Sequence, residues 1–200
     1  MKIARGQSTV LQLNAASPAI SINASSISFG AIVVDNSTTQ TVTISSTGTA
    51  ALTVNSIGVT GTGFSASAVS LPATLNPGQS INVTLTFSPS ATGSATGQLT
   101  VSSNSSTNSS ITIGLSGTAN PHQVNLAWSP PSSSGVAITG YKVYRAVGSG
   151  GFAALSSANS QTSYSDTSVN SGTSYQYYVT SVDSSGVESS PSNTTSVAIP

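Results

Sequence analysis

Residues 80–87 read Ser80-Ile-Asn-Val-Thr-Leu-Thr-Phe87, and apolar side chains occupy every second position of this stretch. Successive side chains of a β-strand point to opposite sides, so a period of two predicts a strand with one face on a core. The same alternation recurs in other short runs, namely Ile20 and Ile22, Ile27 and Phe29, Val42 and Ile44, Leu52 and Val54, Ile57 and Val59, Leu99 and Val101, and Ile111 and Ile113.

Clusters of Gly, Pro, Asn and Ser, such as Asn76-Pro-Gly78, separate these runs. Short strands at regular spacing between turns are typical of a β-sandwich. No stretch shows a sustained 3.6-residue stripe, so we expect an all-β protein with little or no helix. Phe29 and Phe87 are predicted core residues, and Gly48 and Gly93 are predicted to adopt a positive φ.

The chain has 200 residues, which suits two sandwiches of about 100 residues each better than one. The composition changes at Pro121-His122, because every tyrosine and the single tryptophan lie beyond that point. We therefore predict two immunoglobulin-like β-sandwiches in tandem, over residues 19–119 and 120–200. Residues 1–18 precede them as an N-terminal arm or leader.

The composition excludes several classes of partner. Only 4% of the residues are charged, and the four basic residues form no stripe for a nucleic acid and no polybasic patch for a membrane surface. No run of 18 apolar residues occurs, so membrane insertion is not expected. The chain has no cysteine, which excludes disulfides and thiolate chemistry and leads us to expect a secreted bacterial protein, extracellular or at the cell surface.

The first predicted sandwich resembles the bacterial Ig-like repeat of the choice-of-anchor D type, related to Hydin-like Ig folds, over residues 24–118. The resemblance rests on short motifs spread over nearly the whole domain: Ser26-Ile-Ser-Phe-Gly30, Thr41-Val-Thr-Ile44, Ala51-Leu-Thr-Val54, Leu71-Pro72, Leu75-Asn-Pro-Gly78, Leu85-Thr-Phe-Ser-Pro89 and Leu115-Ser-Gly117.

Residues 122–199 resemble a fibronectin type III domain. The segment Ser171-Gly-Thr-Ser-Tyr-Gln-Tyr-Tyr-Val179 is similar to the loop and strand that carry the family's tyrosine corner. The resemblance places Tyr141, Tyr175, Tyr177 and Trp128 in the core. It also implies an extracellular spacer, an adhesion module or an appendage of a secreted enzyme. Integrin recognition is not implied, because Ser184-Ser-Gly-Val187 stands where an Arg-Gly-Asp loop would be needed.

Residues that carry chemistry are few, and we predict no enzymatic activity, no catalytic residue and no cofactor. The only histidine, His122, lies at the predicted domain boundary, where it is expected to serve as a linker residue rather than as a general base. Asp183 and Glu188 face each other across a predicted hairpin, but two carboxylates make a poor calcium cage. A solvated turn is the preferred interpretation, and no metal site is predicted.

Two groups of residues are candidate interaction sites. Tyr144 and Tyr178 are expected to point away from the core and to form a small exposed aromatic patch near Lys142. Thr9, Val10, Leu11, Gln12 and Leu13 form a short segment in the arm. This segment has three open interpretations: an extra strand, a flexible leader, or an assembly arm that completes the sheet of a neighbouring molecule.

The leading hypothesis is a non-catalytic extracellular structural or adhesive module that acts through protein partners or self-association. One alternative is a subunit of an extracellular filament assembled by donation of the N-terminal strand. The other is an accessory carbohydrate-binding region of a secreted enzyme, for which a line of exposed aromatic side chains would be the signature.

Overall fold

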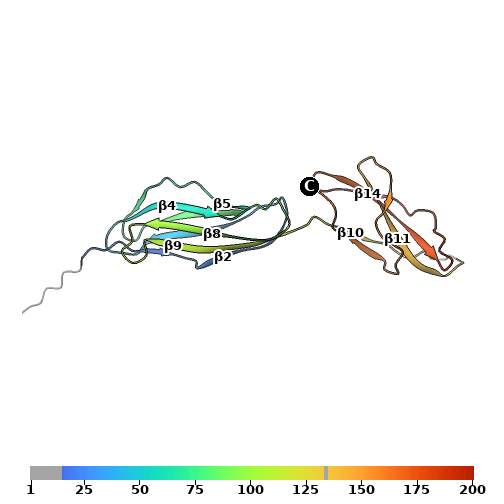
Figure 1. Ribbon diagram of the computed structural model, residues 1–200, viewed down its shortest axis with the longest axis horizontal. Helices are drawn as coiled ribbons and strands as arrows, with labels where there is room; N and C mark the ends of the chain where they lie inside the picture. The colour runs from blue at the N-terminus through green and yellow to red at the C-terminus, as the bar shows by residue number, and fades with distance from the viewer. Residues whose placement is uncertain (1–14, 133–134) are drawn as a thin grey trace, which may run out of the picture. The chain divides into compact units, whose positions relative to one another are not determined.

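The computed structural model describes residues 15–132 and 135–200, and over these ranges the chain forms fifteen β-strands and no helix (Figure 1). Its contacts divide the chain into two units. The first contains residues up to Ile32 together with Asn36–Thr118, and the second contains Val33–Asp35 together with Ala119–Pro200. The predicted all-β class with tandem sandwiches is confirmed. None of the described segments is a helix long and apolar enough to cross a membrane.

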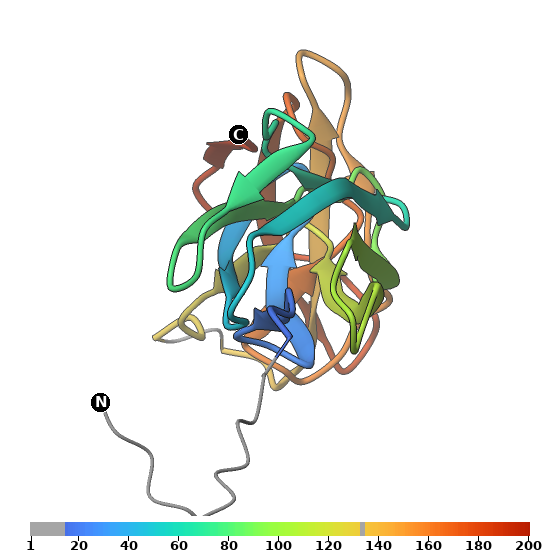
Figure 2. The ribbon, with the colours of Figure 1, turned by 90° about the vertical axis from the view of Figure 1, so that its left-hand side faces the viewer.

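The first unit is a sandwich of two sheets, whose strands run from blue to green in Figures 1 and 2. One sheet has the strand order β1 (Ile20–Ile22), β3 (Thr38–Ser46), β7 (Ser80–Phe87) and β5 (Phe64–Ala66). The other has the order β2 (Ser26–Val33), β9 (Ser110–Asn120), β8 (Gly93–Ser103), β4 (Leu52–Thr60) and β6 (Ala73–Leu75).

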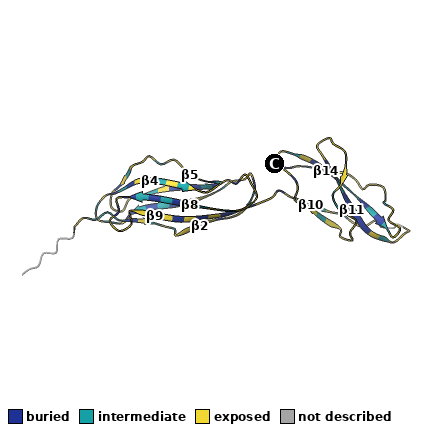
Figure 3. Cartoon of the chain, viewed as in Figure 1, coloured by how far each residue is buried: buried dark blue, intermediate teal, exposed yellow. Residues whose placement is uncertain are grey.

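The alternating residues that define these strands also form the core. In β7 the side chains of Val83, Leu85 and Phe87 are fully buried, whereas the intervening positions are only half-buried. Figure 3 shows buried and more exposed positions along the labelled strands of both units. Phe87 stacks on Phe64 with ring centroids 4.7 Å apart, and Phe29 lies 5.6 Å from Phe64. Close-packed aromatic rings bury a large apolar area, which is the main source of stability in a sandwich of this size.

The two predicted turn glycines have different roles. Gly93 has a φ of +121°, as predicted. Gly48 is not among the residues of positive φ, so the prediction for that position was wrong. A Cβ on Gly48 would lie 2.2 Å from the carbonyl oxygen of Ser17, and the small side chain is therefore required by the close approach of another segment.

The second unit is also formed by two sheets. The larger has the order β12 (Ala153–Ala154), β11 (Ile138–Val147), β14 (Ser174–Asp183) and β15 (Thr195–Ala198). The smaller has only β10 (Val124–Ala127) and β13 (Ser163–Asp166). Val143, Tyr175 and Tyr177 are buried between the sheets, and Val124, Leu126 and Trp128 pack against them while staying half-buried.

The second core contains the tyrosine corner that the resemblance implies. Tyr175 is buried near the start of β14, and its hydroxyl oxygen accepts a hydrogen bond from the backbone N–H of Asn170 at 2.9 Å. A tyrosine at this place, bonded to the backbone a few residues upstream, is a hallmark of immunoglobulin-like sandwiches. Tyr141 and Tyr177 are also buried, as predicted.

A buried ionic network joins β11, β13 and β14. Asp166, 2% exposed, accepts hydrogen bonds from Arg145 at 2.8 Å and from the Tyr177 hydroxyl at 2.9 Å. It also accepts bonds from the backbone N–H and the hydroxyl of Ser168. Burial opposes ionisation, yet the bonds from Ser168, Arg145 and Tyr177 hold the pKa of the Asp166 carboxyl below its ordinary value.

Candidate functional site

Tyr144 and Tyr178, expected to form a small exposed patch, lie on the face of the larger sheet opposite the core, where both side chains are half-buried. Tyr144 on β11 and Tyr178 on β14 are direct partners in the strand register, and their rings stack 4.8 Å apart at an interplanar angle of 18°. Their neighbours Val143 and Tyr177 are buried, so the period of two sends the two tyrosines to the opposite face. Cross-strand aromatic pairs of this kind hold each other in place.

A third aromatic side chain joins this pair. Phe152 follows the glycine-rich turn Gly148–Gly151, its side chain is 39% exposed, and its ring centroid lies 4.6 Å from that of Tyr178. We call Tyr144, Phe152 and Tyr178 the aromatic cluster. The alternation of apolar residues did not indicate Phe152 as part of this patch. Its position after a glycine-rich turn could have indicated an exposed aromatic residue. Only the fold shows which rings it contacts.

Glu188 fixes one side of the aromatic cluster. Its carboxylate accepts hydrogen bonds from Lys142 and from the hydroxyls of Tyr144 and Thr180. The hydrogen bond from Lys142 contributes most, and together these bonds lower the pKa of Glu188 to about 2. The hydrogen bond with Glu188 also raises the pKa of Lys142. The aromatic cluster is therefore bordered by a charge pair that is already neutralised within the molecule.

Asp183 and Glu188 do not form a common site. Asp183 accepts hydrogen bonds from the backbone N–H groups of Ser185 and Val187, which close the turn between β14 and the following segment. Glu188 instead contacts Lys142. Within residues 15–132 and 135–200, no three His, Cys, Asp or Glu side chains come together in a group that would hold a metal ion.

His122 is buried, and within the described residues no hydroxyl group is hydrogen-bonded to its Nε2. Its Nε2 lies 3.9 Å from a carboxylate oxygen of Asp35 and makes no hydrogen bond in the described part of the chain. A catalytic histidine must reach the hydroxyl or thiol that it deprotonates at hydrogen-bond distance. This arrangement offers no such pair.

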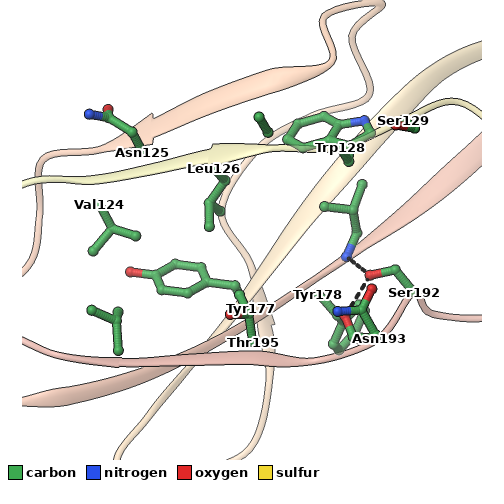
Figure 4. Close-up of a pocket in the computed structure, with 13 residues that line it drawn as sticks. Val124, Asn125, Leu126, Trp128, Ser129, Tyr177, Tyr178, Ser192, Asn193 and Thr195 are labelled. Carbon is green, nitrogen blue, oxygen red and sulfur yellow. Dashed lines mark hydrogen bonds between the residues drawn. The ribbon is translucent and has the colours of Figure 1, made fainter.

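A groove of about 700 Å³ opens between β10 and the pair β14 and β15 (Figure 4). Figure 4 shows Val124 and Leu126 on one side of this space and Tyr177 and Thr195 on the other. Further apolar lining comes from Trp128, Val179 and Val197. The candidate arm residues Thr9, Val10, Leu11, Gln12 and Leu13 lie outside the described residues.

The fold defines the class of protein: a tandem β-sandwich protein of the immunoglobulin-like type. The chain belongs to the Cep192 domain 4 family, whose model matches residues 17–120. The model of the fibronectin type III domain matches residues 109–198. Domains of these two kinds are commonly protein-interaction modules and are typically non-enzymatic.

Several solved structures are similar to this chain at low identity. The ASH/PapD-like domain of human CEP192 (PapD-like domain 7) is 14% identical with a TM-score of 0.45, over 60% of this chain and 97% of that one. A protein of unknown function from Porphyromonas gingivalis W83 is 16% identical with a TM-score of 0.46, and the match covers 53% of this chain and 49% of that one. The secreted serine protease VesC from Vibrio cholerae is 13% identical with a TM-score of 0.42, and the match covers 90% of this chain and 51% of that one. No curated protein matches the chain. The family models therefore carry the assignment.

Proposed function

We propose that this chain is a non-catalytic structural or adhesive module of a bacterial extracellular or cell-surface protein, and that it contacts a protein partner through the aromatic cluster. The first sandwich would then be a repeat of the choice-of-anchor D type within its family. The observation that carries the proposal is the aromatic cluster itself, three neighbouring rings on an outer sheet face, locked by the contacts of Tyr144 and Tyr178.

The chemistry of this face suits a protein interface. Aromatic side chains are enriched at interface centres, because they bury much area while few rotatable bonds become ordered. The contacts of Tyr144 with Tyr178 and Glu188 order these side chains before any partner arrives. Since Lys142 already neutralises Glu188, a partner need not bring a charge of its own.

The geometry favours a protein over a carbohydrate ligand. A sugar-binding platform needs ring faces open to solvent, so that the C–H groups of a sugar can lie flat on them. Here one face of Tyr144 is turned toward Tyr178, and Phe152 packs against Tyr178 as well. Contacts within the aromatic cluster therefore cover part of the ring faces, and Phe152 is its exposed ring.

The extracellular location belongs to the same proposal. It is supported by the absence of cysteine and by a surface in which Ser, Thr and Asn replace charged residues. Such a chain keeps its stability independent of the redox state of its surroundings.

The test compares the wild type with the double variant Phe152→Ser and Tyr178→Ser. Both are immobilised and exposed to proteins released from the surface of intact cells of the producing species, and in parallel to a panel of soluble polysaccharides. We expect a surface protein to bind the wild type and to lose at least tenfold in affinity on the double variant. Val147→Thr, at a half-exposed position of the same sheet, is the matched control.

Two outcomes would contradict the proposal. Binding of a polysaccharide that the double variant abolishes would place a carbohydrate site on this face. Equal binding of a surface protein by both chains would remove the aromatic cluster from the interface.

A further inference from the structure

The smaller sheet of the second sandwich has an open edge. Within the described residues β10 pairs only with β13, while the facing sheet has four strands. The N–H of Trp128 donates to the carbonyl of Thr162, so in this antiparallel register alternate residues of β10 turn their backbone groups toward β13. The backbone N–H and C=O groups of Asn125 and Ala127 therefore point outward, which is the arrangement that receives another strand.

The core beneath this edge is incompletely covered. Five apolar side chains that pack against this core are only half-buried. On β10 and just after it these are Val124, Leu126 and Trp128, and on the facing sheet they are Val179 and Val197. These side chains line the groove of about 700 Å³. β15 is the last strand of its sheet, so the groove lies between two sheet edges (Figure 4). An added strand beside β10 would bury these apolar side chains.

The comparison with the fibronectin model indicates why the strand is missing. That model matches the chain from residue 109, before the second unit begins at Ala119. The extra residues are those of β9, which is hydrogen-bonded between β2 and β8 in the first sandwich. The chain thus uses in its first sandwich the segment that its second sandwich would otherwise have at its start.

We propose that the segment Thr9-Val-Leu-Gln-Leu13 of a second copy of this chain binds in the groove as an additional strand beside β10. This inference rests on the proposed structural role and names one partner for it. In a strand, Thr9, Leu11 and Leu13 share one face, which would meet Leu126 and its apolar neighbours. The five residues are enough to span the four residues of β10, and none of them is charged.

The anchoring of the N-terminal residues favours a second copy over the same chain. Ser17 and Pro18 are tied to the turn between β8 and β9, through hydrogen bonds of 2.6 Å and 3.0 Å to Ser106. Within β9, eleven residues of extended strand separate this turn from Asn120 by about 36 Å. Leu13 is only four residues from Ser17, a span of about 14 Å.

Cross-linking tests the contact directly, since the chain has no cysteine of its own. Gln12→Cys places a thiol on the outward face of the arm, and Ala127→Cys places one on the exposed outward face of β10. We expect a short bismaleimide to convert the doubly substituted chain into a ladder of dimers and longer multimers. The matched control pairs Gln12→Cys with Ala153→Cys, an exposed position on β12, the edge strand at the other end of the larger sheet.

Equal ladders from both cysteine pairs would overturn the proposal, since the arm would then not select β10. A single-chain product in which one bismaleimide links both thiols would also overturn it, by showing that each chain binds its own arm.

Binding of an isolated peptide gives a second measurement that does not depend on assembly. A labelled peptide of residues 7–15 should bind the chain that lacks residues 1–14, and the peptide with Leu11→Asp and Leu13→Asp should bind at least tenfold more weakly. Equal binding of the two peptides, or of neither, would contradict the proposal. Phe152→Ser alone changes an aromatic-cluster residue that does not line the groove. It should leave both assays unchanged, so failure of strand donation and failure of the proposed protein interface are distinguishable.

Discussion

Asp166 shows how one residue ties the second sandwich together. Arg145, Ser168 and Tyr177 come from different parts of the chain, and all donate to its carboxylate. A buried carboxylate is costly unless its oxygens are fully paired, and here every donor is in place. Burial and the bond to Asp166 raise the pKa of Tyr177 well above its ordinary value, so this tyrosine stays a hydrogen-bond donor at any physiological pH.

The first prediction concerns the dependence of stability on pH. The folded-state pKa of Asp166 lies below its value of about 3.9 in an unfolded chain. Its contribution is therefore fully present above about pH 4, and it is lost as the pH falls through the lower folded-state value. Asp166→Asn should cost about 3 kcal/mol at neutral pH and flatten the loss of stability below pH 4. Urea unfolding, monitored by Trp128 fluorescence at several pH values, measures the free energy of unfolding of both chains. A variant with the same pH dependence as the wild type would refute the prediction.

The second prediction concerns the tyrosine corner. Tyr175→Phe removes the acceptor for the Asn170 N–H and should destabilise the second sandwich by about 1 kcal/mol. Tyr164→Phe is the matched control, because the Tyr164 hydroxyl makes no hydrogen bond in the described residues. If both variants lose the same stability in urea, the corner bond contributes nothing of its own.

At the scale of elements, the two faces of a strand can differ greatly in how well they tolerate a larger side chain. In β9, Gly117 faces the core, and a Cβ built there would lie 2.5 Å and 2.8 Å from ring carbons of the fully buried Phe87. Gly114 lies on the same strand facing outward, and a Cβ there meets nothing within 4 Å. The glycine at 117 is therefore a requirement of packing between two sheets.

The third prediction follows from this contrast. Gly117→Ala should destabilise the first sandwich by about 1 to 3 kcal/mol, since the fully buried Phe87 ring would have to shift to admit the added methyl group. Gly114→Ala should change the stability by less than about 0.5 kcal/mol. Thermal unfolding followed by circular dichroism measures both variants, and similar melting temperatures for the two would show that the core rearranges around the added methyl group.

At the scale of the whole molecule, the two sandwiches have separate cores and separate aromatic reporters. The described phenylalanines of the first core include Phe29, Phe64 and Phe87, whereas all tyrosines and the only tryptophan lie in the second unit. Tyrosine and tryptophan fluorescence therefore reports unfolding of the second sandwich alone. Circular dichroism in the far ultraviolet reports both.

The fourth prediction uses these two signals. Phe87→Ala should lower the stability of the first sandwich by about 3 to 5 kcal/mol through loss of the buried ring. The transition seen by circular dichroism should shift to lower temperature, while that seen by Trp128 fluorescence stays in place. If the two transitions move together by the same amount, the sandwiches unfold as one cooperative unit.

Much of the fold could be predicted from the sequence because strand formation is a local matter. The period of two in Ser80–Phe87 determines which side chains of β7 face inward, and the structure buries Val83, Leu85 and Phe87. The same rule put Tyr144 and Tyr178 on an outer face. Gly48 could not be interpreted in this way, because its constraint comes from Ser17, a residue distant in the sequence.

The sequence by itself determined the two sandwiches and the faces of their strands, since each depends on patterns within a few residues. The tyrosine corner was implied by the resemblance to fibronectin type III domains. Only the tertiary structure decided that Phe152 joins the tyrosine pair, that Glu188 turns to Lys142 rather than to Asp183, and that β10 is left with an open edge. These features depend on which strands become neighbours. That choice is made by long-range pairing and by burial of the whole core, and no local pattern encodes it.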